Sequence, residues 1–246
     1  MSKTIVLIPA RLKAKRLPFK PLLKIKNYSL VQHVYNRAVE SGIGDVIVAT
    51  GDKEIADEIK SINGNFIITK KEHNTGTDRI YEAFQKIKNK EKFDYIINLQ
   101  GDEPFISPKD IFNLNKFSRS NFSDIATLAY KIKKKNLLDK NIVKLETLDN
   151  LEKKKISRVK NFFRYKKKIE FYKTFQHIGI YQYKTTILKR FVGLKQSKNE
   201  LTLSLEQYRA LDNGILIDAV MAKKSSMGID TIDDYMEIKK IMEYKS

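Results

Sequence analysis

The chain has 246 residues, a formal net charge of +19 and no cysteine. The lack of cysteine excludes disulfides, thiolate catalysis and cysteine-based zinc sites, and it fits a reducing compartment such as the cytoplasm. The positive charge predicts attraction to an anion, which would be a nucleic acid, a membrane surface or a phosphorylated substrate. No apolar run approaches the roughly 20 residues that span a bilayer, so we expect a cytoplasmic protein that does not insert into membranes.

The N-terminal stretch predicts a strand followed by a basic loop. The apolar run 5–8 is typical of a buried strand, which ends at Pro9 because proline cannot donate to the sheet ladder. The cations that follow are Arg11, Lys13, Lys15, Arg16 and Lys20. Pro18 and Pro21 restrict the backbone around them, and ligands of open α/β sheets bind after the carboxyl ends of strands. Such a loop suits a polyphosphate, although basic side chains are often only a solvated surface.

Strands and helices alternate through the first half of the chain. Apolar spacing predicts strands at 45–50, 66–68, 94–99 and 125–130, and helices at 29–41, 53–62, 77–88 and 111–117. This alternation favours an α/β fold with a mostly parallel central sheet, right-handed crossovers and helices on both faces. Neither phosphate-binding glycine motif is present, so side chains would have to bind the phosphates.

The pattern loosens in residues 131–173. Alternation near 143–145 and 170–172, with lysine clusters between, predicts hairpins or an inserted arm rather than a second core. Beyond it we expect a strand at 177–183 and helices at 185–192, 204–213 and 233–242. Because there is no repeat and no obvious linker, the sequence predicts a single domain over residues 1–246.

Two acidic segments are candidates for chemistry. Asp102 and Glu103 follow the predicted strand 94–99 and would suit magnesium, which prefers oxygen ligands, although such Asp-Glu-Pro turns are often structural. Asp230 and Thr231 precede the last helix, where either residue could instead be its N-cap.

Two further segments combine a structural role with a possible functional one. Thr75 and Gly76 could offer a hydroxyl and open backbone amides to a base or ribose, while Thr75 would also cap the helix after it. His177 lies in an apolar strand, where a histidine is usually a hydrogen-bonded core residue.

Ala10-Arg11 and the stretch from Arg16 to Leu22 resemble the opening of the CMP-Kdo synthetases, or 3-deoxy-manno-octulosonate cytidylyltransferases. Further segments resemble this family in the same order: 73–79, 100–104, 177–181 with 206–207, and 228–231. The resemblance implies a Rossmann-like nucleotidyltransferase fold. It also implies a dimerisation arm, placed around residues 131–190, that pairs two subunits into a homodimer.

The resemblance also implies the site residues. The implied catalytic residues are Arg11, Arg16, Lys20 and Asp102. The implied nucleotide site consists of Ala10, Arg11, Lys20, His73, Thr75, Gly76, Arg79 and Gln100. The implied sugar site consists of Gln100, Arg158, Arg164, His177, Tyr181, Glu206 and Gln207. Asp102 and Asp230 are implied as ligands of Mg²⁺.

The implied reaction joins CTP to the acidic sugar 3-deoxy-D-manno-octulosonate (Kdo), giving CMP-Kdo and pyrophosphate for lipopolysaccharide or capsule synthesis. One alternative is a cytidylyltransferase for another ulosonic acid, such as 8-amino-Kdo or a sialic-acid-like sugar, because Asn161-Phe162-Phe163 departs from the family pattern next to Arg164. A basic nucleic-acid-binding protein is the alternative outside enzymes. The chain has no recognisable nucleic-acid-binding motif, and such a protein has no need of carboxylates at a sheet edge.

Overall fold

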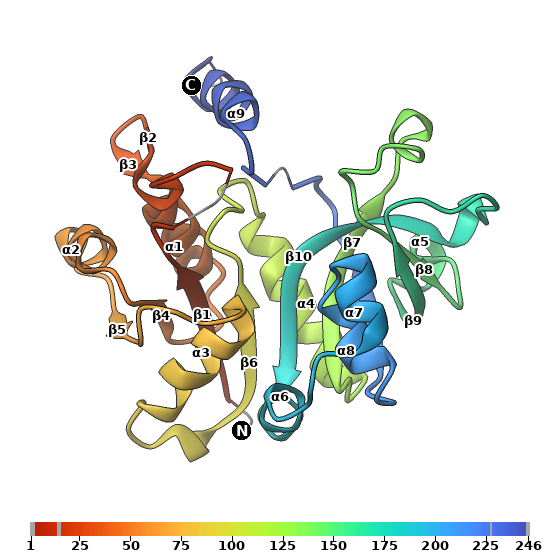
Figure 1. Ribbon diagram of the computed structural model, residues 1–246, viewed down its shortest axis with the longest axis horizontal. Coiled ribbons are helices and arrows are strands. Elements are labelled where there is room, and N and C mark those ends of the chain that lie inside the picture. Colours follow the sequence, from red (N-terminus) through yellow and green to blue (C-terminus); the bar gives the residue numbers. More distant parts are fainter. Residues whose placement is uncertain (1–2, 14–15, 227, 245–246) are drawn as a thin grey trace. The chain divides into compact units, whose positions relative to one another are not determined.

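The computed structural model describes residues 3–13, 16–226 and 228–244. The chain divides into two compact units (Figure 1): unit 1 comprises Met1–Phe112 and Ser226–Ser246, and unit 2 comprises Asn113–Ser225. The single domain over residues 1–246 therefore stays a prediction. None of the helices within the described ranges is long and apolar enough to cross a membrane.

Unit 1 is built on four parallel strands. They are β1 (Lys3–Ala10), β4 (Val46–Thr50), β5 (Phe66–Ile68) and β6 (Phe93–Leu99), in the order β5-β4-β1-β6. In the register of the sheet, Ile8 pairs with Val48 and Val6 with Ile97. The central strand β1 is buried from its second residue to its last, as expected for a parallel strand covered on both faces. The parallel arrangement predicted for the first half of the chain is confirmed here.

Helices and short elements connect these strands. The helices are α1 (Leu30–Glu40), α2 (Lys53–Ser61), α3 (Gly76–Gln85) and α4 (Pro108–Ser120), of which α4 crosses into unit 2. The short elements are the 3₁₀ helices η1 (Lys20–Leu22) and η2 (Lys90–Lys92) and the hairpin of β2 (Lys24–Ile25) and β3 (Tyr28–Ser29). The helix α3 ends three residues before the predicted Lys88, because the chain turns into η2 through Asn89 in a left-handed conformation.

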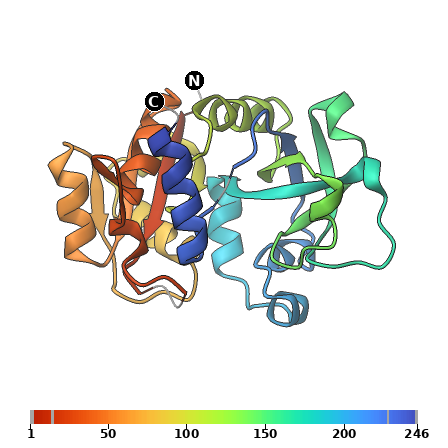
Figure 2. The same cartoon turned by 90° about the horizontal axis from the view of Figure 1, so that it is seen from above.

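The C-terminal helix α9 (Ile232–Tyr244) belongs to unit 1, far in sequence from its neighbours there. It lies against the small hairpin near the N-terminus (Figure 2), where the Tyr235 hydroxyl donates to the Lys24 carbonyl at 2.6 Å. An apolar cluster joins the two segments, consisting of Leu17, Ile25, Leu30, Ile229, Tyr235 and Ile238. This packing fixes the residues just before α9 beside the basic loop.

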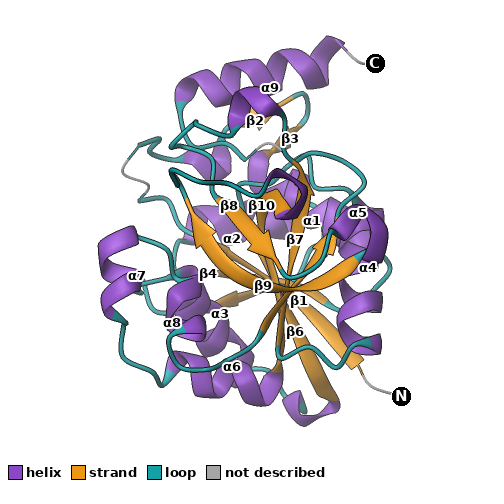
Figure 3. Ribbon diagram, turned by 90° about the vertical axis from the view of Figure 1, so that its right-hand side faces the viewer, coloured by secondary structure: helices purple, strands orange, loops and turns teal. Residues whose placement is uncertain are grey.

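Unit 2 has five strands in a different arrangement. Figure 3 draws the strands of both units in orange. They are β7 (Ile125–Lys131), β8 (Lys144–Thr147), β9 (Ile156–Phe163), β10 (Thr174–Lys184) and β11 (Ile217–Met221). Their order is β10-β7-β11-β9-β8, and β8 also pairs with β10, so the strands close on themselves. Only β7 and β11 run parallel. The prediction of a mostly parallel sheet is therefore wrong for unit 2.

Several elements of unit 2 also differ from the sequence-based expectation. The strands β9 and β11 were not predicted, because polar residues such as Arg158 and Asp218 interrupt their apolar pattern. The alternation at 170–172 overlaps the 3₁₀ helix η4 (Phe171–Lys173), whose N-cap is Glu170. The helix predicted at 204–213 is shorter, as α8 (Gln207–Leu211), and α7 (Lys198–Leu203) precedes it. The remaining elements are η3 (Lys134–Asn136), α5 (Leu151–Lys154) and α6 (Thr185–Val192), and α6 matches its prediction.

The net charge is distributed unevenly between the units. Unit 2 contains 26 Lys and Arg against 10 Asp and Glu, so it holds +16 of the chain's +19. The lysine clusters 133–135, 153–155 and 166–168 all belong to it. The large positive charge is therefore mainly a property of unit 2 and does not by itself mark a phosphate site in unit 1.

Candidate active site

A cavity of about 360 Å³ lies in unit 1 at the carboxyl ends of β1 and β6. Its lining residues are Pro9, Ala10, Arg11, Arg16, Leu17, Lys20, Pro21, His73, Thr75, Gly76, Arg79, Gln100, Gly101, Asp102 and Asp230. All the residues predicted for catalysis, nucleotide binding and metal binding are among them. The cavity lies where open α/β sheets bind their ligands.

Two glycines allow the segments around the cavity to approach one another closely. A Cβ atom on Gly76 would lie 3.1 Å from Cγ of Pro9, and one on Gly101 would lie 3.0 Å from the Pro9 carbonyl oxygen. Any larger residue would push the start of α3 or the turn after β6 away from the end of β1.

Thr75 is the N-cap of α3, as the sequence predicted. Its hydroxyl accepts from the backbone N–H of Asp78 at 3.1 Å, and the Asp78 carboxylate accepts from the backbone N–H of Thr75 at 3.1 Å. This capping box fixes the start of the helix beside the cavity, where the positive end of the helix dipole favours an anion. Its role toward a nucleotide stays a prediction.

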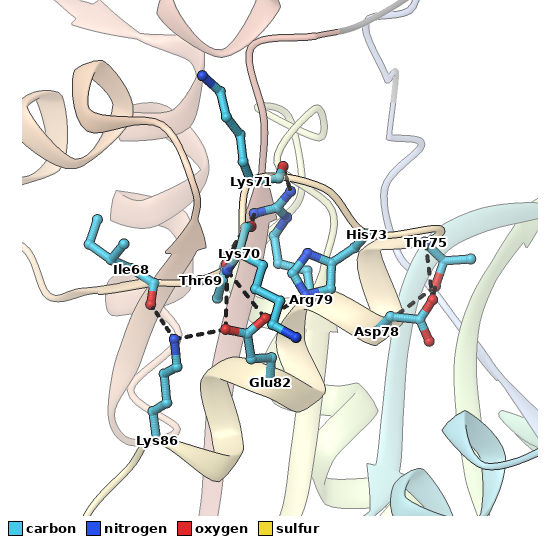
Figure 4. Close-up of polar contacts among 10 residues, drawn as sticks. All are labelled: Ile68, Thr69, Lys70, Lys71, His73, Thr75, Asp78, Arg79, Glu82 and Lys86. Carbon is cyan, nitrogen blue, oxygen red and sulfur yellow. Dashed lines mark hydrogen bonds and ion pairs between the residues drawn. The ribbon is translucent and has the colours of Figure 1, made fainter.

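Arg79 fastens the loop that follows β5 (Figure 4). Its guanidinium donates to the Thr69 hydroxyl at 2.6 Å and to the carbonyls of Lys70 and Lys71, both at 3.0 Å. The side chain is almost fully buried, at 2% exposure. Because these donors are already engaged, the main contribution of Arg79 in this structure is to shape one wall of the cavity.

Glu82 on α3 holds the same loop, and sequence reasoning missed it because it resembles a solvated helix residue. Its carboxylate accepts from the ring of His73 at 2.7 Å, from the backbone N–H of Lys70 at 3.1 Å and from the ammonium of Lys86 at 2.7 Å. Burial tends to raise the pKa of Glu82, but hydrogen bonds from Lys86, Lys70 and His73 outweigh burial and lower it. A carboxylate only accepts, so Nε2 of His73 carries the proton.

Asp52 is a second positioning residue that sequence reasoning did not single out. Its buried carboxylate accepts from the backbone N–H of Leu12 at 2.8 Å and so fastens the basic loop to the turn after β4. The available signal was its place at the carboxyl end of a predicted strand, directly after Gly51.

The two acids predicted to bind metal meet at one ammonium group. Nζ of Lys20 lies 2.7 Å from Oδ2 of Asp102, 3.5 Å from Oδ1 of Asp230 and 2.6 Å from the carbonyl oxygen of Ile229. Arg16 forms a second ion pair with Asp230, at 2.9 Å. Residues far apart in the sequence thus converge on a single cation.

The helix cap next to Asp230 is formed by other residues. The Thr231 hydroxyl accepts from the backbone N–H of Asp234 at 3.2 Å, and the Asp234 carboxylate accepts from the backbone N–H groups of Asp230 and Thr231. The side chain of Asp230 is therefore directed to the cations and does not cap α9.

Asp102 and Asp230 fit a divalent metal by their donor atoms. Within residues 3–13, 16–226 and 228–244, no group of three or more His, Cys, Asp or Glu could hold a metal ion. Magnesium, however, is usually bound by one or two carboxylates together with substrate phosphates and water. Two carboxylates that share one ammonium in a cavity lined by cations suit that mode of binding.

Glu103 is the acid beside this pair. Burial and the neighbouring charge of Asp102 raise the pKa of Glu103 to about 7, although a hydrogen bond from the Ser226 hydroxyl opposes the shift. Its carboxyl group therefore differs in protonation behaviour from an ordinary surface glutamate.

The residues predicted for the sugar lie in unit 2, except Gln100. Nε of Arg158 donates to the buried carboxylate of Asp218 at 2.7 Å, and Asp218 also accepts from Ser123 at 2.6 Å and Asn121 at 3.0 Å. Arg158 thus neutralises a buried acid and remains 35% exposed. Arg164 is exposed and donates to the carbonyl oxygen of Asn141 at 3.1 Å.

Three other sugar candidates line a small cavity within unit 2. These are Tyr181, Glu206 and Gln207, and the Gln207 amide donates to the Tyr181 hydroxyl. Oε1 of Gln207 is buried and has no hydrogen-bond partner in the described part of the chain. The structure therefore brings these three residues together.

His177 is held in a different way. Its Nε2 lies 3.0 Å from the Thr127 hydroxyl, which itself donates to the Ile180 carbonyl at 2.7 Å, so the histidine is the donor. The rings of Phe162 and Tyr181 pack against it, each with its centroid at 5.4 Å. Burial lowers the pKa of His177 to about 3, which keeps the ring neutral.

A mixed α/β fold with a basic loop, a capped helix and two carboxylates around one cavity is the arrangement expected of a nucleotidyltransferase. Residues 5–224 match the sequence model of the cytidylyltransferase family. The chain is 42% identical to the 3-deoxy-manno-octulosonate cytidylyltransferase of Thermodesulfovibrio yellowstonii, with 94% of each chain covered, and 36% identical to that of Bartonella tribocorum, with 97% and 98% covered. A solved structure of CMP:2-keto-3-deoxy-manno-octonic acid synthetase complexed with CTP is 32% identical, with a TM-score of 0.89 and both chains fully covered.

The chain therefore belongs to the cytidylyltransferase family and, within it, to the 3-deoxy-manno-octulosonate cytidylyltransferases. The predicted family and the predicted enzyme class are confirmed.

Proposed function

We propose that this protein transfers the cytidylyl group of CTP to Kdo and releases pyrophosphate. One observation carries the proposal: Arg11, Arg16 and Lys20 line the same cavity as Asp102 and Asp230. Cations that can bind a triphosphate and carboxylates that can bind a divalent metal are the two components that this chemistry needs. Membership of the family supports the choice of CTP and Kdo over other pairs of substrates.

In the proposed reaction a hydroxyl of the sugar gives up its proton to solvent and its oxygen attacks the α-phosphorus. A new P–O bond forms, the bond between the α-phosphorus and the oxygen that bridges to the β-phosphorus breaks, and pyrophosphate leaves. Arg11 and Arg16 hold the triphosphate, and the loop fastened by Arg79 and Glu82 carries His73 to the nucleotide. Mg²⁺, when bound by Asp102 and Asp230, neutralises charge on the phosphates and on the leaving oxygens. Positioning and charge stabilisation suffice, so we assign no covalent nucleophile.

We assign the acidic sugar to Gln100, Arg158, Arg164, His177, Tyr181, Glu206 and Gln207. The shared cavity of Tyr181, Glu206 and Gln207 supports part of this assignment. Another ulosonic acid is the second candidate substrate, favoured by Asn161-Phe162-Phe163 before Arg164 and by the pairing of Arg158 with Asp218.

We also propose that residues around 131–190 form an arm that pairs two subunits into a homodimer. Large apolar side chains exposed in this arm support the idea, because such groups are often covered by a partner. They are Leu138 at 67%, Leu148 at 50%, Tyr165 at 51% and Tyr172 at 78% exposure. We also place the reaction in the cytoplasm, because a chain without cysteine fits a reducing compartment. We assign its product to lipopolysaccharide or capsule synthesis.

Pyrophosphate release tests the proposal. The protein is incubated with CTP, Mg²⁺ and either Kdo, 8-amino-Kdo or a sialic acid, and the assay is repeated with ATP and GTP. We expect the highest kcat/KM with CTP and Kdo. Preference for another acid would transfer the assignment to that sugar, and no release with any acid would contradict it.

A further inference from the structure

The ammonium group of Lys20 has used all its donors in this structure. It has three N–H groups, and three oxygen atoms surround it: Oδ2 of Asp102, the carbonyl of Ile229 and Oδ1 of Asp230, at 2.7, 2.6 and 3.5 Å. The Lys20 side chain is only 14% exposed. An ammonium that is already bonded three times has no donor left for a phosphate.

The backbone under this side chain is fixed. Lys20 begins the 3₁₀ helix η1, Pro21 follows it, and the backbone N–H of Lys20 donates to the Leu17 carbonyl at 3.2 Å. A change in the position of the ammonium would therefore come from rotation of its flexible stem. Because Lys20 lines the cavity together with Arg11 and Arg16, the rotated side chain would stay within reach of a bound triphosphate.

The carboxylates of Asp102 and Asp230 differ in the cations that pair with them. Asp230 has a second cation, Arg16, in an exposed pair whose side chains are 67% and 50% accessible. Asp102 forms its ion pair with Lys20. A divalent cation that binds Asp102 would have to share that carboxylate with the ammonium, and two cations at such short range repel each other.

We propose that Lys20 is an internal counter-ion, which occupies the position between Asp102 and Asp230 in the nucleotide-free protein and must leave it when a divalent metal binds. This inference rests on the proposed metal role of the two acids. In the exchange the ammonium gives up the carboxylates to the metal and turns its donors to the triphosphate. Lys20 therefore keeps the metal site closed until a metal and a nucleotide arrive together.

Metal binding without nucleotide tests this exchange. The probe is Mn²⁺ alone, which takes oxygen ligands as Mg²⁺ does, measured by the loss of its free electron-paramagnetic-resonance signal. Lys20→Met removes the charge and keeps most of the stem. We expect it to bind Mn²⁺ roughly tenfold or more tightly than the unmodified protein, because a competing cation has gone. Lys20→Arg, which keeps the charge, should bind Mn²⁺ as weakly as the unmodified protein.

Lys13→Met is the matched control, because it removes a lysine from the same loop. Lys13 pairs with Glu72 at 3.2 Å and is 80% exposed, so its loss should leave Mn²⁺ affinity unchanged. Without metal, Lys20→Met should melt at a lower temperature than the unmodified protein, and Mn²⁺ should raise that temperature more than it does for the unmodified protein. If Lys20→Met proves unfolded, Lys20→Gln takes its place.

Mn²⁺ affinity that is equal in Lys20→Met, Lys13→Met and the unmodified protein would overturn the exchange. This result is separate from the outcome for the proposed reaction, because the measurement needs neither CTP nor a sugar. A protein that shows the Lys20 effect but releases no pyrophosphate with any acidic sugar would contradict the proposed function alone.

Discussion

Asp230 is a residue for which the sequence offered two roles, a metal ligand and a helix cap. The cap of α9 is made by Thr231 and Asp234, and the Asp230 side chain meets Lys20 and Arg16. We expect Asp230→Asn, like Asp102→Asn, to lower pyrophosphate release steeply with little change in melting temperature. Each change keeps the shape of the side chain and removes a negative ligand.

The measurement is a titration with magnesium beside a thermal melt. Asp234→Ala is the control, which should cost about 1 kcal/mol of stability through the lost cap. A stable Asp230→Asn protein with near-normal turnover and unchanged magnesium dependence would rule out the metal role.

Arg158 has a structural partner that complicates its proposed role toward the sugar. Arg158→Ala should raise the KM for the acidic sugar roughly tenfold or more and leave the KM for CTP nearly intact, since a hydrogen bond to a charged group contributes about 1.5–3 kcal/mol. It should also lower stability, because the buried Asp218 loses its cation. Steady-state kinetics and a melt separate the two effects. A lower melting temperature with both KM values unchanged would leave Arg158 a structural residue only.

His177 predicts a dependence of stability on pH. The pKa of His177 is about 3 in the folded protein, below its ordinary value of 6.5. The buried neutral ring therefore contributes its full stability to the fold above pH 6.5, and this stability is lost as the pH falls toward 3, because the unfolded chain binds the proton first. His177→Gln keeps a donor for Thr127 and removes the titration. The difference in unfolding free energy between the unmodified protein and His177→Gln should therefore change between pH 7 and about pH 4.5, by on the order of 2 kcal/mol in favour of the variant. Parallel curves of unfolding free energy against pH for the two proteins would contradict the shift.

At the scale of elements, α3 and the loop after β5 act together, because Glu82 and Arg79 on the helix hold residues 69–73. We expect Glu82→Gln to raise the KM for CTP several-fold with a smaller effect on kcat. The loop would lose its fixed position, whereas the proposed metal ligands Asp102 and Asp230 would stay in place. Glu82→Asp should restore part of the effect. Glu40→Gln removes an exposed glutamate that pairs with Arg37 on α1 and serves as the control. Equal changes in kcat and in kcat/KM would place Glu82 in the chemical step instead.

For the whole molecule, ligand binding should raise stability by mass action. CTP with Mg²⁺ at 100 times its Kd should add about 2.7 kcal/mol, whereas ATP and GTP at the same concentration should add much less. In Asp102→Asn, the stabilisation by CTP should no longer depend on magnesium. Differential scanning fluorimetry checks both outcomes. Equal shifts with purine triphosphates would contradict selectivity for cytosine.

The sequence by itself determined most of unit 1. Its strands and helices are continuous segments with clear periodicity, so β5 matches its predicted bounds and α2 ends one residue before the predicted position 62. The cavity residues after β1 and β6 were placed at the ends of predicted strands. The family motifs then identified the nucleotide and metal candidates, all of which line one cavity. Local periodicity and the order of motifs are enough to predict a residue's place in the fold when that place follows from the residue's own segment.

Only the tertiary structure decided which distant residues meet. Asp230 reaches Lys20 because α9 packs on the hairpin near the N-terminus, and Glu82 and Asp52 became positioning residues through contacts with loops outside their own elements. In unit 2, β9 and β11 lack a clear local pattern because Arg158 and Asp218 lie inside them and are stabilised by pairing with each other. Such pairings depend on long-range packing, which local periodicity does not encode.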